Sequence, residues 1–206
     1  MRALGSVARV EMVEVLLLAL VAVITAWSGY QAALWNSKSA LSYGRANALR
    51  VSAQGSETLA GQQMLFDAIT FDSWLVAAEA HDTRLMTFLQ SRFRPEFTVA
   101  FDAWTATKPF QDPAAPPGPS AMPQYRNANL DRASQLEEQA ATAFDAGNQQ
   151  RDVADEYVRT TVLLAVVLFL TALSQRFTVR NIRIAVLTLA VAILAVSVFG
   201  LVTLNA

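Results

Sequence analysis

The stretch that decides the fold is TAWSGYQAALWNSKSALSYGRANALR, residues 25–50. It begins inside an apolar run and ends among polar residues, yet it contains no proline and only two glycines. Proline is the residue that most strongly breaks a helix, and isolated glycines only weaken one. We therefore expect a helix that leaves a membrane and continues into water, because it packs against a second helix that does the same.

Composition indicates a membrane protein. The chain has 206 residues, of which 53% are hydrophobic, and the apolar residues are concentrated in a few runs. Such an uneven distribution is typical of membrane segments rather than of a soluble core. A net charge of −1 argues against nucleic acid as a partner, since phosphate binding needs a basic surface. Without cysteine the chain can form no disulfide, thiolate nucleophile or thiolate metal site.

Three apolar runs are predicted to be transmembrane helices, at residues 12–35, 157–175 and 184–204. The length of each run is close to the roughly 20 residues that a spanning helix requires. The first run could instead be a cleaved signal peptide. Two acids, Glu11 and Glu14, precede its apolar core, and the helical pattern continues to Trp35, so a retained span is favoured.

The loop between the second and third spans, residues 176–183, predicts the orientation. It contains Arg176, Arg180 and Arg183 and no acid, and short arginine-rich loops stay in the cytoplasm. The N-terminus, residues 1–11, then also lies inside, while residues 36–156 and the tail 205–206 lie outside. Residues 36–159 carry 15 acidic and 11 basic side chains, which suits a translocated segment. We expect a multi-pass protein of the bacterial inner membrane.

The segment between the first two spans is predicted to be helical, because alanine, leucine, glutamine, glutamate and arginine dominate it. Six of the seven prolines fall within residues 109–123, which we expect to form a loop. The predicted fold is therefore an all-α membrane protein with three transmembrane helices. An extracytoplasmic helical bundle or a long helical hairpin is inserted between spans 1 and 2.

The bundle and the hairpin differ in the longer arm. In a bundle, Gly55 and Gly61 fold this arm back on itself, whereas a hairpin keeps it straight and returns through a short helix after Pro95. We favour the bundle because it buries more of the aromatic side chains. These are Phe66, Phe71, Trp74, Phe97, Phe101 and Trp104.

Small residues recur every seven positions along both arms, as in the seam of a close-packed helix pair. On the second arm they are Ala133, Ala140, Gly147 and Ala154. On the first arm they form two separate sets, Ala46, Ala53 and Ala60, and Ala26, Ala33 and Ala40 across the membrane boundary. An alanine-rich helix can also show this spacing by chance. Gly29 and Ala33 form a small-xxx-small pair, which favours close helix packing or oligomerisation.

Few polar residues are candidates for a site. The one histidine, His81, follows Asp67 and Trp74 in a seven-residue register, so we interpret it as partly buried in an aromatic layer rather than as a metal ligand. Glu11 and Glu14 could bind ions, but at headgroup depth they are more simply paired with the arginine loop. Other polar side chains of the first span could bond to neighbouring helices or line a pore; these are Thr25, Ser28 and Gln31.

No phosphate loop, zinc-binding HExxH, GxSxG elbow or pair of catalytic carboxylates appears in the sequence. We therefore predict no enzyme activity and no cofactor. The first hypothesis is an oligomeric scaffold or an accessory subunit of a membrane complex, in contact with lipid and with its own copies. The alternatives are an ion channel or transporter subunit and an extracytoplasmic ligand sensor.

Two stretches, AWSGYQAALWNSKSA (residues 26–40) and DEYVRTTVLLAVVLFLTALSQRF (residues 155–177), together with the last apolar run, resemble a group of uncharacterised bacterial inner-membrane proteins. That resemblance implies one N-terminal span, a helical polar segment and a C-terminal pair of spans, and no known activity. A weaker likeness is to the four-helix-bundle periplasmic sensor domains of bacterial receptors. The chain lacks the cytoplasmic signalling module of those receptors.

Overall fold

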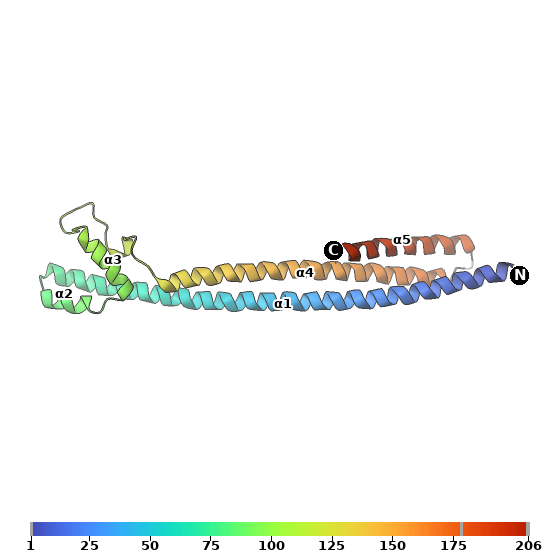
Figure 1. The fold of residues 1–206 in the computed structure, drawn as a ribbon, viewed down its shortest axis with the longest axis horizontal. Helices are drawn as coiled ribbons and strands as arrows, with labels where there is room; N and C mark the ends of the chain where they lie inside the picture. The colour runs from blue at the N-terminus through green and yellow to red at the C-terminus, as the bar shows by residue number, and fades with distance from the viewer. Residues whose placement is uncertain (1, 178, 205–206) are drawn as a thin grey trace. The chain divides into compact units, whose positions relative to one another are not determined.

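The computed structural model describes the backbone of residues 2–177 and 179–204, and the side chains of residue 12 and of residues 14–177 and 179–203. Over these residues the protein is helical, with no strand, which confirms the predicted all-α class (Figure 1). The helices are α1 (Arg2–Glu79), α2 (Thr83–Gln90), α3 (Pro95–Ala106), α4 (Ala128–Ser174) and α5 (Arg180–Leu204), with a 3₁₀ turn η1 (Pro119–Ala121). The helices α1, α4 and α5 are long and apolar enough to cross a membrane.

Helix α1 confirms the prediction made from residues 25–50, since it continues through them without a break for 78 residues. It also passes through Gly55 and Gly61, so these glycines do not fold the arm back, contrary to the preferred expectation. A single glycine costs a helix only about 1 kcal/mol relative to alanine. The buried neighbours Ala53 and Ala60 hold this part of the helix in place.

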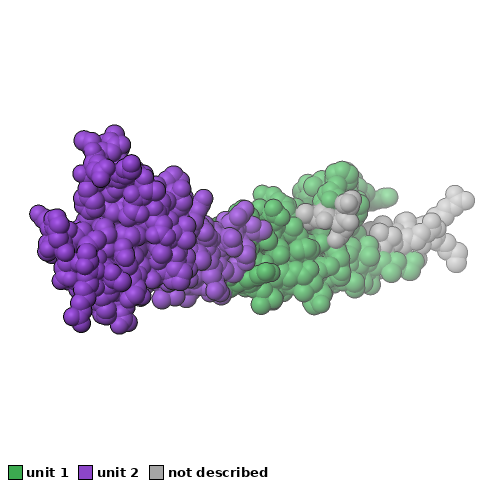
Figure 2. Space-filling model, turned by 60° about the vertical axis from the view of Figure 1, so that its left-hand side comes forward, with its two compact units in different colours: residues 1–45, 143–206 green, residues 46–142 purple. Residues whose placement is uncertain are grey.

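The chain forms two compact units (Figure 2). Unit 1 consists of residues 1–45 and 143–206, and unit 2 consists of residues 46–142. Unit 1 contains the apolar runs, and unit 2 contains α2, α3 and the proline-rich loop. We describe each unit by itself.

In unit 1 the three apolar helices share one core. Val21 of α1, Leu164 and Val167 of α4, and Ala190 of α5 are completely buried against one another. A second cluster joins Ala32 of α1 to other parts of the unit; its further members are Tyr157 and Leu201. Most large apolar side chains on the other helix faces are exposed, as expected for faces that contact lipid.

The close seam of unit 1 lies between α1 and α4 and uses serine as well as small apolar residues. The Ser39 hydroxyl donates a hydrogen bond of 2.8 Å to the Gly147 carbonyl, and the Ser28 hydroxyl donates one of 3.0 Å to the Tyr157 carbonyl. A Cβ atom on Gly147 would lie 2.7 Å from the Tyr43 ring, so only glycine fits there. The polar groups of the seam are therefore satisfied by the facing backbone.

One set of predicted seam residues is wrong: Ala26, Ala33 and Ala40 are exposed. Residues on a different face of α1 meet α4 instead, namely Ser28, Ala32 and Ser39. The helix is rich in alanine and serine, so several faces satisfy a seven-residue spacing. The sequence prediction counted only alanine, and it therefore missed the face on which serine bonds to the opposite backbone.

In unit 2 the α1–α4 seam is lined by alanine. Ala46, Ala53 and Ala60 of α1 are buried, as are Ala133 and Ala140 of α4. At the end of the seam, polar contacts take over: the Asn127 amide donates to the Ala60 carbonyl (3.4 Å), and the Asn129 amide donates to Gln63 Oε1 (3.1 Å). Small side chains thus let α1 and α4 approach closely, and amide hydrogen bonds join the two helices where α4 begins.

An aromatic cluster joins α1 to α3 in unit 2. Helix α3 starts at Pro95, as predicted, because proline is favourable at the first helical position. Its spacing of four and three places Phe97, Phe101 and Trp104 on one face, which packs against Trp74 of α1. Phe66 is an exception to the predicted core and is 46% exposed, because it lies about 100° around α1 from the buried Asp67.

Candidate functional site

A buried ion pair joins the start of α1 to the start of α5 in unit 1. The guanidinium of Arg183 donates from Nε to Glu14 Oε1 (2.8 Å) and from Nη2 to Glu14 Oε2 (2.6 Å). Glu14 is only 2% exposed. The Ser174 hydroxyl lies 3.5 Å from Glu14 Oε1. A bidentate pair of this kind neutralises a charge that would otherwise be costly inside an apolar unit.

The remaining residues of the predicted interfacial pairing lie apart from this pair. Arg176 and Arg180 are exposed and form no ion pair within the part of the chain that the structure describes. The side chain of Glu11 lies outside the described residues, as does the tail 205–206. The structure therefore brings together one of the two acids and one of the three arginines that the sequence singled out.

Two polar residues of the first predicted span, Thr25 and Ser28, have partners within unit 1. Thr25 donates to the Val21 carbonyl (2.7 Å). Ser28 donates to the Tyr157 carbonyl and also accepts a bond of 3.1 Å from Thr161. The Gly29–Ala33 pair has no close neighbour within the described chain, since a Cβ on Gly29 would meet nothing within 4 Å and Ala33 is exposed.

A second buried ion pair lies in unit 2, beneath the aromatic cluster. Asp67 of α1 is 2% exposed, and it accepts hydrogen bonds from Arg94 Nε (2.9 Å) and Nη2 (2.7 Å). The Tyr125 hydroxyl donates to Asp67 Oδ2 at 2.8 Å. The carboxylate is thus held by three donors. These bonds join α1 to the start of α3 and to the chain that follows η1.

This environment changes the ionisation of its members. Burial, assisted by the hydrogen bond to Asp67, raises the pKa of Tyr125 to about 12. The hydrogen bond to Asp67 also raises the pKa of Arg94 above its ordinary value. Because both pKa values are raised, Tyr125 stays a neutral phenol and Arg94 stays a positively charged guanidinium throughout the physiological pH range.

Sequence reasoning missed this network. Arg94 precedes Pro95, and a residue before proline adopts extended backbone, here with φ −66° and ψ 148°. That conformation places Arg94 at the point where α3 begins. One signal could have indicated a partner for Asp67: it shares a seven-residue register with Ala53, Ala60 and Trp74, so its carboxylate had to be buried.

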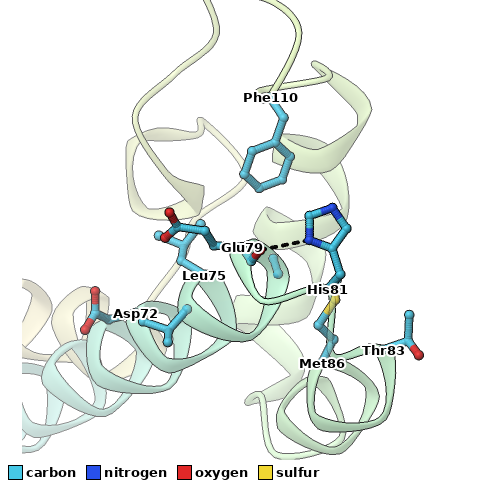
Figure 3. Close-up of a pocket in the computed structure, with 9 residues that line it drawn as sticks. Asp72, Leu75, Glu79, His81, Thr83, Met86 and Phe110 are labelled. Carbon is cyan, nitrogen blue, oxygen red and sulfur yellow. Dashed lines mark hydrogen bonds between the residues drawn. The ribbon is translucent and has the colours of Figure 1, made fainter.

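His81 does not lie in the aromatic layer, so that interpretation was wrong. Helix α1 ends at Glu79, and His81 adopts a left-handed backbone with φ 58°, leaving its side chain exposed. Its Nδ1 lies 2.8 Å from the Glu79 carbonyl oxygen (Figure 3). A helical register cannot be extended beyond the helix end, and here the end is followed by Asp82, which caps α2 by accepting from the Leu85 amide.

His81 lines a cavity of about 840 Å³ at the end of α1, which we call the Phe110 cavity. Figure 3 shows that its lining comes from the last turns of α1, the start of α2 and the loop that carries Phe110. Its residues are Asp72, Leu75, Val76, Ala78, Glu79, His81, Thr83, Met86 and Phe110. No group of three histidine, aspartate or glutamate side chains among the described residues could hold a metal ion.

Comparison with known proteins adds no relative: no protein-family model matches this chain, and no similar curated protein or solved structure is found. The function must therefore be argued from the contacts themselves.

Proposed function

We propose that this chain is a non-catalytic membrane protein that forms homo-oligomers and acts as a scaffold or accessory subunit of a membrane complex. Its three apolar helices would cross a bacterial inner membrane, with unit 2 on the outer side. The apolar length of these helices supports the spanning role. Three arginines where α4 is followed by α5 support the orientation, since short basic connections between spans remain in the cytoplasm; Arg176 precedes α5, and Arg180 and Arg183 lie in its first turns.

The orientation predicts a labelling pattern. The chain has no cysteine, so a single introduced cysteine reports one position only. Ser120→Cys, in the exposed proline-rich loop, should react with a membrane-impermeant maleimide in intact cells. Val179→Cys, exposed between α4 and α5, should react only after lysis. The reverse pattern would place unit 2 in the cytoplasm and contradict the proposed orientation.

The observation that carries the assembly proposal is an exposed apolar face on α1 in unit 2. Four large apolar side chains, between 46% and 61% exposed, share it at helical spacing: Leu59, Leu65, Phe66 and Ile69. This outer face lies away from the seam with α4, beyond the apolar run at residues 12–35. Several large apolar side chains gathered on one face that is exposed to water mark an interaction site.

The chemistry of this face favours a second copy of the same chain as its partner. A symmetric interface sets each patch against its own copy, so a charge at its centre would meet a like charge. Between residues 58 and 71 the only charged side chain is Asp67, which is buried and paired with Arg94. The outer face of this stretch is therefore neutral and can meet itself without repulsion.

Two negative charges on this face should disrupt the assembly. In detergent, the wild-type chain should have the mass of a dimer or a larger oligomer, as measured by light scattering or native mass spectrometry. Leu65→Glu with Ile69→Glu should lower the association constant at least about tenfold, because burial of each side chain contributes roughly 1.5–3 kcal/mol and the new carboxylates would face their own copies.

The matched control is Gln135→Glu with Gln139→Glu, which adds the same charge at the same spacing to the exposed face of α4 in unit 2. This variant should assemble like the wild type. A monomeric wild type, or equal masses for the two double variants, would refute assembly through this face.

The alternative of an ion path through the first span is less well supported. The acid of this span, Glu14, is neutralised by Arg183, and the Thr25 and Ser28 hydroxyls donate to backbone carbonyls within unit 1, a use that helix packing alone explains. The sensor alternative has one specific observation in its favour, which is the Phe110 cavity.

A further inference from the structure

The Phe110 cavity has the size and lining of a small-molecule site. Pockets that enclose small ligands have volumes of about 300–1,000 Å³ and mostly apolar walls with a few polar groups. This cavity measures about 840 Å³. Its apolar wall is formed by Leu75, Val76, Ala78, Met86 and Phe110.

Phe110 is positioned as a ligand-contacting ring. It packs on one side against Trp74 and Trp104, with ring centroids 6.4 and 6.1 Å away, which anchors it to the aromatic cluster. Its side chain nevertheless remains 70% exposed at the cavity. A held ring with an open face can bind a cation through its π electrons or pack against an apolar body.

The charge of the cavity is negative. Asp72 and Glu79 lie seven residues apart on α1 and thus on one face, about 10.5 Å apart along the axis. Neither carboxylate forms a hydrogen bond or ion pair with the described residues, and no lysine or arginine is among the described residues that line the cavity. The two charges are therefore free to attract a positive ligand.

His81 is compatible with that selection. Its Nδ1 lies 2.8 Å from the Glu79 carbonyl oxygen, which can only accept, so Nδ1 carries a proton. In the neutral ring Nε2 is then an acceptor and can receive a hydrogen bond from a ligand N–H. Among the described residues no group of side chains is suited to a bare metal ion, and such an ion would make no favourable contact with the apolar wall.

We propose that the Phe110 cavity binds an organic cation with an apolar body, with Asp72 and Glu79 supplying the charge and Phe110, Leu75 and Met86 the apolar contacts. The site lies wholly within unit 2. It does not depend on the assembly face, because none of the four side chains that define that face lines the cavity.

The test uses the full chain in nanodiscs of zwitterionic lipid, titrated by calorimetry with benzyltrimethylammonium. This probe is water-soluble and combines a cation with an aromatic ring. Wild type should bind it saturably, and Asp72→Asn with Glu79→Gln should weaken binding about five- to thirtyfold, since it removes both charges that attract the cation. Phe110→Leu should weaken it several-fold.

Two controls separate recognition from general electrostatics. Glu57→Gln with Asp102→Asn removes the same charge from exposed positions of unit 2 outside the cavity and should bind like the wild type. Benzenesulfonate, an aromatic probe with the opposite charge, should not bind. Absence of saturable binding up to about 10 mM, equal binding by the two double variants, or equal binding of the anion would each overturn the proposal, whatever the oligomeric state.

Discussion

Replacing Arg94 with methionine should lower the stability of unit 2 by about 3–5 kcal/mol. Methionine keeps part of the apolar stem but removes both guanidinium donors, so the Asp67 carboxylate, 2% exposed, retains the Tyr125 hydroxyl of its three donors. A buried charge that loses its partner keeps its desolvation cost without the compensating attraction. Native-state hydrogen exchange at the α3 amides measures the loss in this unit directly.

Two comparisons make this result specific. Arg92→Met removes an exposed arginine that lies 5.1 Å from the Phe88 ring, and it should cost no more than about 1 kcal/mol. Adding Asp67→Asn to Arg94→Met should recover much of the loss, because an amide buried beside Tyr125 carries no net charge. Equal protection of the α3 amides from exchange in the Arg92 and Arg94 variants would show that the buried pair does not hold α3 against α1.

Replacing Arg183 with methionine should destabilise unit 1 by a similar amount, about 3–5 kcal/mol. Arg183 forms both bidentate bonds to Glu14, which is buried where α1, α4 and α5 meet. Loss of the guanidinium leaves the acid among apolar side chains. Thermal unfolding of the full chain in detergent should shift downwards by several degrees.

Arg180→Met is the matched control, because it removes the same charge from an exposed residue at the start of α5. It should leave the melting temperature nearly unchanged. Glu14→Met combined with Arg183→Met should return most of the stability, since buried ion pairs can often be replaced by apolar side chains of similar volume. If the Arg180 and Arg183 variants melted alike, the ion pair would have no structural role.

The helices were the predictable part of the fold. Their signals are local: an uninterrupted stretch from residue 25 to residue 50, a proline at position 95 that opens α3, and prolines at 109–123 that keep the chain out of helix. Helix α4 begins at Ala128, shortly after these prolines, and continues through the second apolar run. Propensity and breakers suffice for such features because they depend only on near neighbours.

The sites were not predictable in the same way. Asp67 meets Arg94 and Tyr125 across separations of 27 and 58 residues, and no periodicity encodes those contacts. The Phe110 cavity lies where α1 ends, at Glu79. The seven-residue register that included His81 assumed that the helix continued, so it did not predict the cavity. Side chains that converge from several elements depend on where the helices end, and helix ends are the least certain feature of a sequence-based prediction.

The close approach at Gly147 also settles how α1 and α4 are aligned in unit 1. A seam of small residues repeating every seven positions has near-translational symmetry, so two such helices could slide by one repeat, about 10.5 Å, and present nearly the same surface. Such a slip would bring Tyr43 against Ala154, whose methyl group occupies the space that Gly147 leaves open. One missing methyl group thus restricts two repetitive helices to a single register.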